Sequence, residues 1–315
     1  MEAFILTPDS APLSRDIAHY PEGIIIPIDK PYRWTSADVI RKVKFAAIRH
    51  FGKKNLKVGH AGTLDPLATG VLLVCIGKAT KLAEELQSHD KEYVAGITFG
   101  ATTPSYDLEK EIDRFFPHEH ITSEAVSEAL PAFIGEQNQI APLFSAKSVD
   151  GVRAYELARR LYKTMEQRDS DDPQSLEKSA EFDEAAKDLI RVSRINISEL
   201  ELVEFTVAER NGGENNTSDT TSATPEEQSI SKASARINVT DNSALGLPRA
   251  VVRMACSKGT YVRAFARDLG EALGSGAHLD SLQRSRSGIF RVEKALTVDQ
   301  AISLLSNGAQ KLEQQ

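Results

Sequence analysis

The stretch KVGHAGTLDPLATG (57–70) leads directly into the apolar segment VLLVCIG (71–77). The apolar segment is short, uninterrupted and closed by glycine, which predicts a fully buried strand. In the stretch before it, Asp65 is the only acid among small, mostly uncharged residues, and Pro66 follows it. An Asp followed by Pro is typical of a helix N-cap, yet a carboxylate with few local partners also suits a nucleophile or a proton carrier. The stretch by itself leaves both interpretations open.

The overall composition is that of a globular protein. The chain has 315 residues, of which 41% are hydrophobic and 26% charged, enough for one large or two ordinary domains. No apolar run approaches the roughly 20 residues that a membrane span needs, and the N-terminus lacks the pattern of a secretory signal. We therefore expect a cytoplasmic protein without membrane contact. Cys75 and Cys256 both lie in apolar runs, so we expect buried thiols rather than a disulfide or a metal site.

The net charge of −7 is distributed unevenly along the chain. Residues 165–190 hold nine acids and three bases, and residues 209–231 hold five acids and one base. The rest of the chain therefore carries a net charge of +3. The second stretch has the composition of a disordered loop, whereas the first is either disordered or a partly helical excursion. We interpret both as acidic insertions in a mildly basic body, which is compatible with a nucleic-acid partner.

The framework between these insertions mixes strand-like and helix-like segments. Period-two and short apolar patterns predict strands at 23–31, 71–77, 91–100, 191–207, 233–240 and 249–257. Helical periodicity with start and stop signals predicts helices at 36–51, 78–87, 122–134, 151–163, 259–274 and 297–305. Strands and helices do not alternate strictly. The expected fold class is α+β, with a mixed, largely antiparallel central sheet flanked by helices.

Basic and aromatic residues gather in two later segments, CSKGTYVRAFARDLG (256–270) and HLDSLQRSRSGIFR (278–291). The arginines in these segments form either a solvated face or a phosphate-contacting surface: Arg263, Arg267, Arg284 and Arg286. Tyr93 and Tyr261 suit either base stacking or core packing. His60 suits either a turn held by backbone hydrogen bonds or a contact with an anionic substrate. An acid such as Asp65 in apolar surroundings stays ionised only beside a cation.

Six segments together resemble the TruB-type family of tRNA pseudouridine synthases, and they occur in the family's order. They cover nearly all of the chain outside the acidic insertions: IPIDKPYRWTSADVIRKVK (26–44), KVGHAGTLDPLATGVLLVCIGKATKL (57–82), KEYVAGITFGATTPSYD (91–107), PLFSAKSVDGVRAYELAR (142–159), CSKGTYVRAFARDLG (256–270) and GAHLDSLQRSRSGIF (276–290). The GHxGxLDPLATG block is highly specific. The resemblance implies an enzyme that isomerises a uridine to pseudouridine in the T arm of tRNA, at position 55.

The resemblance also assigns roles to residues of this chain. Asp65 is implied as the catalytic carboxylate, Tyr93 as the aromatic residue that stacks on the base and abstracts a proton, and Arg263 as the ion-pair partner of the carboxylate. His60, Tyr261 and Leu279 are implied to contact or pack near the flipped nucleotide. We expect Arg284 and Arg286 to contact the substrate from the basic surface. Neither a metal nor any other cofactor is implied, and we expect a monomer.

The same resemblance suggests how the domain is delimited. We expect an N-terminal extension at 1–22, the pseudouridine synthase catalytic domain at 23–306 with its two acidic insertions, and a tail at 307–315. The chain continues for only about 25 residues after RSRSGIF, so we expect no C-terminal PUA-type RNA-binding domain. Two departures concern single positions. Ser148 stands where a Lys is usual, with Lys147 one place earlier, and ATTPSYDLE replaces a T-D-T-x-D pattern while retaining Asp107.

Two other functions remain to be separated from this one. A non-catalytic tRNA-binding or tRNA-folding module could share the fold, although it would not need Asp65, Tyr93, Tyr261 and Arg263 together. A pseudouridine synthase could also act on a different RNA target. Formation of pseudouridine in a T-arm transcript, with and without the Asp65 carboxylate, distinguishes these possibilities.

Overall fold

A computed structural model describes residues 2–142, 148–149, 152–153, 192–207 and 237–306 of the chain. Both acidic insertions, most of the helix expected at 151–163 and the tail lie outside these residues. Residues 152–153, where that helix was expected to start, pair instead with 148–149 in a short antiparallel hairpin. Residues 237–240, the described half of the strand expected at 233–240, are not in a strand, so that prediction was wrong there.

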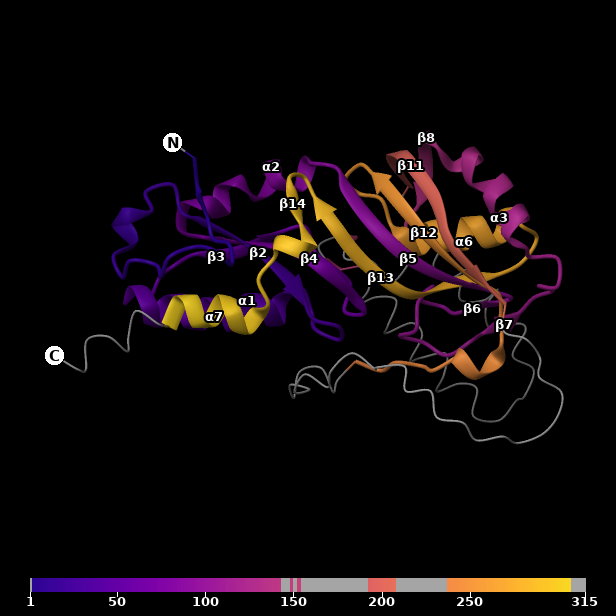
Figure 1. Cartoon of the computed structure of the whole chain (residues 1–315), viewed down its shortest axis with the longest axis horizontal. Helices are drawn as coiled ribbons and strands as arrows, with labels where there is room; N and C mark the ends of the chain where they lie inside the picture. Colours follow the sequence, from indigo (N-terminus) through magenta and orange to yellow (C-terminus); the bar gives the residue numbers. More distant parts are fainter. Residues whose placement is uncertain (1, 143–147, 150–151, 154–191, 208–236, 307–315) are drawn as a thin grey trace.

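A single ten-stranded sheet runs along the long axis of the described chain (Figure 1). Eight strands follow one another in the order β1-β2-β4-β13-β5-β12-β11-β8, while β3 pairs with β4 and β14 pairs with β13. Two pairs, β1 with β2 and β4 with β13, are parallel, and the other pairs in this sheet are antiparallel. The strands are β1 (Phe4–Ile5), β2 (Ile24–Lys30), β3 (Val58–Ala61), β4 (Ala68–Ile76), β5 (Lys91–Phe99), β8 (Gly135–Ile140), β11 (Val192–Thr206), β12 (Arg249–Cys256), β13 (Ala277–Ser287) and β14 (Phe290–Arg291). The expectation of a mixed, largely antiparallel sheet is confirmed.

Helices cover the sheet at both ends (Figure 1). Helix α1 packs on α7 beside β2 and β3, and α6 packs on β13 and β5. The α-helices of the described residues are α1 (Ser36–Phe51), α2 (Ala83–Ser88), α3 (Ser123–Ala129), α6 (Val262–Ala272) and α7 (Val298–Ser306). Short 3-10 turns accompany them at Ile17–His19, Gly77–Leu82, Leu130–Phe133, Ser243–Leu245 and Val292–Lys294, and two small hairpins add β6 (Ala101–Thr102) with β7 (Arg114–Phe115) and β9 (Ser148–Val149) with β10 (Val152–Arg153). No helix of the described residues is long and apolar enough to cross a membrane.

The local sequence explains why α1 begins and ends where it does. The Thr35 hydroxyl accepts a hydrogen bond from the Asp38 backbone N–H, and the Asp38 carboxylate accepts one from the Thr35 N–H, which makes a capping box. Gly52 ends the helix in the left-handed conformation with φ 61°. Both signals were predicted from the sequence, and the helix has the expected bounds.

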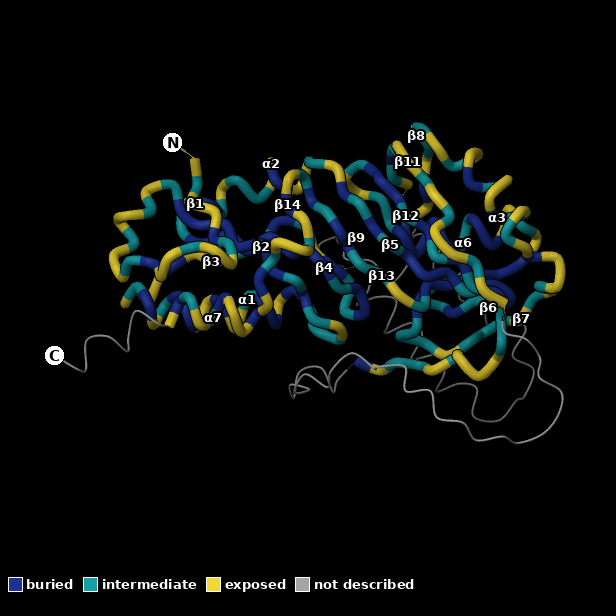
Figure 2. The backbone as a smooth tube through the Cα atoms, in the orientation of Figure 1, coloured by how far each residue is buried: buried dark blue, intermediate teal, exposed yellow. Residues whose placement is uncertain are grey.

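Strand β4 is buried on both of its faces, which accounts for its unbroken apolar run. Leu72, Val74 and Ile76 belong to the main core, whereas Leu73 and Cys75 belong to a second cluster on the opposite face. A strand covered on both sides needs apolar residues at every position rather than at every second one. Figure 2 shows this continuous burial through the centre of the sheet.

The N-terminal residues pack against this same sheet. β1 pairs in parallel with β2, and Leu6 and Leu13 are buried in the main core. Residues 4–13 therefore share the hydrophobic core of the segment that was expected to begin at residue 23.

Candidate active site

The turn that carries Asp65 leads into β4 and lies beside the start of α6. The Asp65 carbonyl accepts a hydrogen bond from the Ala68 backbone N–H, and strand β4 starts at once. No helix follows Pro66, so the interpretation of Asp65 as a helix N-cap was wrong. The physical reason is that Ala68 and the residues after it pair with β13, which requires an extended backbone.

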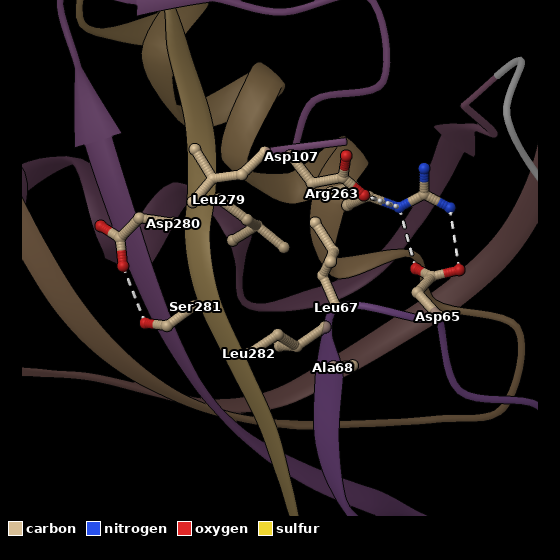
Figure 3. Close-up of a pocket in the computed structure, with 10 residues that line it drawn as sticks. Asp65, Leu67, Ala68, Asp107, Arg263, Leu279, Asp280, Ser281 and Leu282 are labelled. Atoms are coloured by element: carbon tan, nitrogen blue, oxygen red, sulfur yellow. Dashed lines mark hydrogen bonds and ion pairs between the residues drawn. The ribbon is translucent and has the colours of Figure 1, made fainter. Parts of the chain in front are cut away.

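Asp65, in the turn before β4, and Arg263, in the first turn of α6, form a two-point ion pair. The Arg263 Nε donates to Asp65 Oδ2 at 2.9 Å, and Nη2 donates to Oδ1 at 3.1 Å (Figure 3). This fork-to-carboxylate geometry fixes the position of both groups. The Asp65 side chain remains 39% exposed, whereas the Arg263 side chain is only 4% exposed. The carboxylate is therefore held from the protein side and open on the other.

A second carboxylate, that of the buried Asp107, also lies against Arg263. Asp107 Oδ2 lies 3.7 Å from Arg263 Nε, and the third guanidinium nitrogen, Nη1, donates to the Ser105 carbonyl at 3.0 Å. Burial raises the pKa of Asp107, while Arg263 and a hydrogen bond from the Ser105 hydroxyl oppose that shift. Burial disfavours the charge of Arg263, but Asp65 and Asp107 together raise its pKa above the usual value.

Lys30 supports the turn from the other side. Its side chain is fully buried at the end of β2, and its Nζ donates to the carbonyls of Pro31, Trp34 and Pro66, the last at 3.1 Å. Burial lowers the pKa of Lys30 to about 7, against the attraction of Asp65 and Asp29. The lysine thereby ties the backbone of the Asp65 turn to the first central strand.

A pocket opens beside this cluster. Figure 3 shows Asp65 and Arg263 at one side of it, with the leucines 67, 279 and 282 forming an apolar wall. Asp107, Leu108 and two residues of β13, Asp280 and Ser281, also line the pocket. The pocket thus presents an apolar surface and an exposed carboxylate side by side.

Tyr93 lies on β5, close to the same carboxylate, and is 9% exposed. Burial raises the pKa of its phenol, and Asp65 adds to that shift, while Arg284 opposes it through a hydrogen bond. β13 pairs with β5 so that Arg284 stands directly opposite Tyr93. The structure thus places Asp65, Arg263 and Leu279 at the pocket, whereas Tyr93 is not among the residues that line it.

Two other predicted site residues, Tyr261 and His60, lie outside the pocket lining. Tyr261 caps the start of α6 and is half-buried, with its backbone N–H and carbonyl both bound by the Gln139 side chain. His60 is half-buried on β3, opposite Val74 of β4. Neither residue lines the pocket beside Asp65.

The two arginines of β13 differ in burial. Arg284 is 2% exposed, and its guanidinium donates to the carbonyls of Val71 at 2.7 Å and Gly62 at 3.0 Å. The expected contact of Arg284 with the substrate does not fit this position, because its donors bind the backbone on either side of the turn that carries Asp65. Arg286 is partly exposed, and its Nε lies 3.9 Å from Glu92 Oε2. Its expected contact with the substrate stays a prediction.

Lys30, Ser105 and Asp107 were not predicted as site residues. The alternation of Ile24, Ile26 and Ile28 in β2 puts Lys30 on the same buried face, a signal that was available in the sequence. Asp107 was noted only as the remainder of a family pattern. Ser148 lies in β9, but its side chain and Lys147 are outside what the structure describes. Among the described residues, no group of three or more His, Cys, Asp or Glu is placed to hold a metal ion.

Comparison with solved structures defines the class of this fold. The chain superimposes on a chain of a Cbf5-Nop10-Gar1 complex with a TM-score of 0.53 at 23% identity, covering 96% of this chain and 60% of that one. A chain from an H/ACA ribonucleoprotein bound to a substrate RNA containing 2'-deoxyuridine gives a TM-score of 0.52 at 20% identity, over 98% and 61% of the two chains. The chain therefore spans about three fifths of these longer proteins. Its fold is that of the pseudouridine synthases.

Sequence comparison then gives the family. Residues 49–172 match the model of the TruB family pseudouridylate synthase N-terminal domain, and residues 263–313 match that of the tRNA pseudouridylate synthase B C-terminal domain. The tRNA pseudouridine synthase B of Phocaeicola vulgatus is 44% identical over 89% of this chain and 92% of its own length. That of Parabacteroides distasonis is 40% identical over 93% and 97%. The chain belongs to the TruB family and is a tRNA pseudouridine synthase. No PUA-type domain is found in the described part of the chain.

Proposed function

We propose that this enzyme converts the uridine at position 55, in the T arm of tRNA, to pseudouridine, with Asp65 as the catalytic residue. The observation that carries the proposal is the Asp65–Arg263 pair. Arg263 occupies two of the roughly four acceptor positions of the carboxylate, and the side chain stays 39% exposed at a pocket. The free acceptor positions are thus available to a ribose placed against the apolar wall.

The isomerisation breaks the bond between the uracil N1 and the ribose C1′, turns the base, and joins C5 to C1′. The proton that leaves C5 is balanced by the one that N1 gains. Asp65 acts at the sugar, either as a nucleophile on C1′ or as an acid and base. Tyr93 stacks on the base and accepts the C5 proton as its own phenol proton is released, which the charge and hydrogen bond of Arg284 favour. The chemistry as written uses no cofactor.

The target base must leave the folded arm before it reaches the pocket. Flipping costs a few kcal/mol, which stacking and phosphate contacts offset. The leucine wall formed by residues 67, 279 and 282 offers one apolar surface for the flipped base. We also propose that the protein is a cytoplasmic monomer.

The experiment measures pseudouridine in an unmodified tRNA transcript after incubation with wild type, Asp65→Asn and Asp16→Asn. Asp16 is an exposed cap residue, so Asp16→Asn is a matched control with the same chemical change. We expect one pseudouridine per transcript at position 55 with wild type and the control, and none with Asp65→Asn. A second transcript with cytidine at that position tests the site.

Three results contradict the proposal. Activity in Asp65→Asn equal to wild type removes the assigned role of the carboxylate. Modification of the cytidine-containing transcript shows that the target lies elsewhere. Tight tRNA binding without any product in wild type favours the alternative of a non-catalytic binding or folding module, which the intact ion pair and exposed carboxylate argue against.

A further inference from the structure

The outer face of α1 concentrates positive charge in a chain whose net charge is −7. Residues 39–57, which comprise most of α1 and the loop after it, contain no Asp or Glu. They contain seven basic residues, all exposed: Arg41, Lys42, Lys44, Arg49, Lys53, Lys54 and Lys57. Helical spacing puts the four cations of the helix on one side, together with Phe45, which is 65% exposed. We call this set of residues the α1 surface.

The opposite side of α1 is already occupied. Val39, Val43 and Ala47 are buried in the main core, and the helix packs against α7. The apolar face that an interfacial membrane helix would insert is therefore not available here. What remains exposed is a charged surface suited to an anionic polymer.

The cations of the α1 surface have little protein to neutralise them. Arg41 pairs with Asp38 at 2.7 Å. Within the described part of the chain, Lys42, Lys44 and Arg49 make no ion pair, and Arg49 instead lies over the Phe45 ring with its Cζ 5.9 Å from the centroid. Spaced cations beside an exposed aromatic ring are typical of a surface that contacts phosphates.

The helix is joined to the active site at its first residue. The Ser36 hydroxyl donates to the Leu64 carbonyl at 3.2 Å and accepts from the Leu64 N–H at 3.0 Å, one residue before Asp65. From that anchor α1 runs for 16 residues, about 24 Å at 1.5 Å per residue. Arg49 stands about 20 Å along the axis from the catalytic turn.

We propose that the α1 surface binds the phosphate backbone of the tRNA outside the arm that holds the target uridine. The inference rests on the proposed function, because a T arm bound at Asp65 determines where the rest of the tRNA lies relative to α1. When the target base is held at Asp65, its own loop lies at the start of α1. The cation at that end of the helix, Arg41, is paired with Asp38. The unpaired cations begin beyond that point, so they meet RNA farther from the target.

The test compares two RNAs and two variants. The RNAs are the full-length unmodified tRNA transcript and its isolated T-arm stem-loop. The first variant is Lys42→Gln/Lys44→Gln/Arg49→Gln, in which Gln preserves helix propensity. The matched control is Arg194→Gln/Arg253→Gln/Arg291→Gln, which removes the same charge from β11, β12 and β14, where Arg194 and Arg291 are exposed and Arg253 is half-buried. Far-UV circular dichroism verifies that each variant is folded.

We expect the α1 variant to bind full-length tRNA roughly 10- to 100-fold more weakly at moderate salt, with the slope of log K against log salt reduced by about 2 to 3. Its affinity for the stem-loop should change less than about threefold, and the control should match wild type on both RNAs. Pseudouridine formation in the saturated stem-loop should be unchanged.

Three outcomes overturn the proposal. Equal losses on both RNAs place any contact within the target arm, and an unchanged affinity for full-length tRNA excludes a contact. If the control variant loses as much tRNA affinity as the α1 variant, the loss is due to net charge and not to the α1 surface. Failure of the proposed function is separate, because it appears as absent or misplaced pseudouridine with wild type, whatever the binding data show.

Discussion

Replacing Arg263 by methionine tests whether one guanidinium both holds the Asp65 carboxylate, which we propose to be catalytic, and neutralises the buried Asp107. Methionine keeps much of the volume but removes every hydrogen bond to Asp65 and Ser105 and the charge beside Asp107. Asp65, with 39% of its side chain exposed, regains water, whereas Asp107, with 8%, does not. The energetic cost therefore falls on Asp107, and the freed Asp65 loses its fixed position.

The magnitude follows from that difference in burial. Removing one partner of a buried ion pair costs about 3 to 5 kcal/mol, and only one of the two carboxylates is deeply buried, so we expect about 3 kcal/mol. For a chain of this size that lowers Tm by roughly 6 °C. Misplacing a reacting group by 1 Å costs on the order of 100-fold in rate, so we expect kcat to fall at least that far.

The assay separates stability from catalysis with a second substitution. Arg263→Met/Asp107→Asn removes the uncompensated buried charge, so it should recover about half or more of the lost Tm while kcat stays low. Differential scanning fluorimetry and single-turnover pseudouridine formation measure the two quantities. The reasoning is refuted if Arg263→Met leaves Tm unchanged, or if the double variant regains activity together with stability.

Other substitutions test neighbouring features. Tyr93→Phe keeps the ring but removes the phenol, so we expect tRNA affinity within threefold of wild type and a rate reduced about 100-fold or more, measured by single-turnover kinetics; an unchanged rate excludes Tyr93 as a proton acceptor. Lys30, whose pKa is lowered to about 7, binds fewer protons in the folded than in the unfolded chain between about pH 7 and 10.5, so it makes stability rise with pH in that window. Urea titrations at pH 7 and 9.5 should show a smaller rise for Lys30→Met than for wild type, and equal rises contradict the assignment. Gly70→Ala should destabilise by about 3 kcal/mol, because φ is +94° and a Cβ would lie 2.3 Å from the Arg284 carbonyl, whereas Gly52→Ala, with open space around it, should cost about 1 kcal/mol. Equal melting temperatures for these two glycine variants would show that β4 and β13 can separate without cost.

The local sequence was sufficient for most of the elements. Alternation placed Tyr93, Ala95, Ile97 and Phe99 on the buried face of β5, and capping residues set both ends of α1. These signals act within a few residues and need no information about the rest of the chain.

Strand β13 was not predicted, although it is 11 residues long and central. Its sequence contains two arginines, and a buried cation contradicts a pattern of apolar strands. Arg284 is accommodated only because carbonyls of Val71 and Gly62 accept its hydrogen bonds, and those partners lie more than 200 residues away in the chain. The Asp65–Arg263 pair, 198 residues apart, was likewise available only through the family resemblance.

The position of β13 between β4 and β5 has a consequence for how the protein forms during translation. β4 and β5 are both made long before residue 277, yet neither completes its pairing until β13 is inserted between them. A nascent chain that ends earlier carries two incomplete strand edges and lacks the central connection of its sheet, a state prone to self-association. Folding to an active enzyme is thus delayed until Ser287 has been made, and chains truncated before Ser287 are expected to be cleared as misfolded rather than to bind tRNA as partial enzymes.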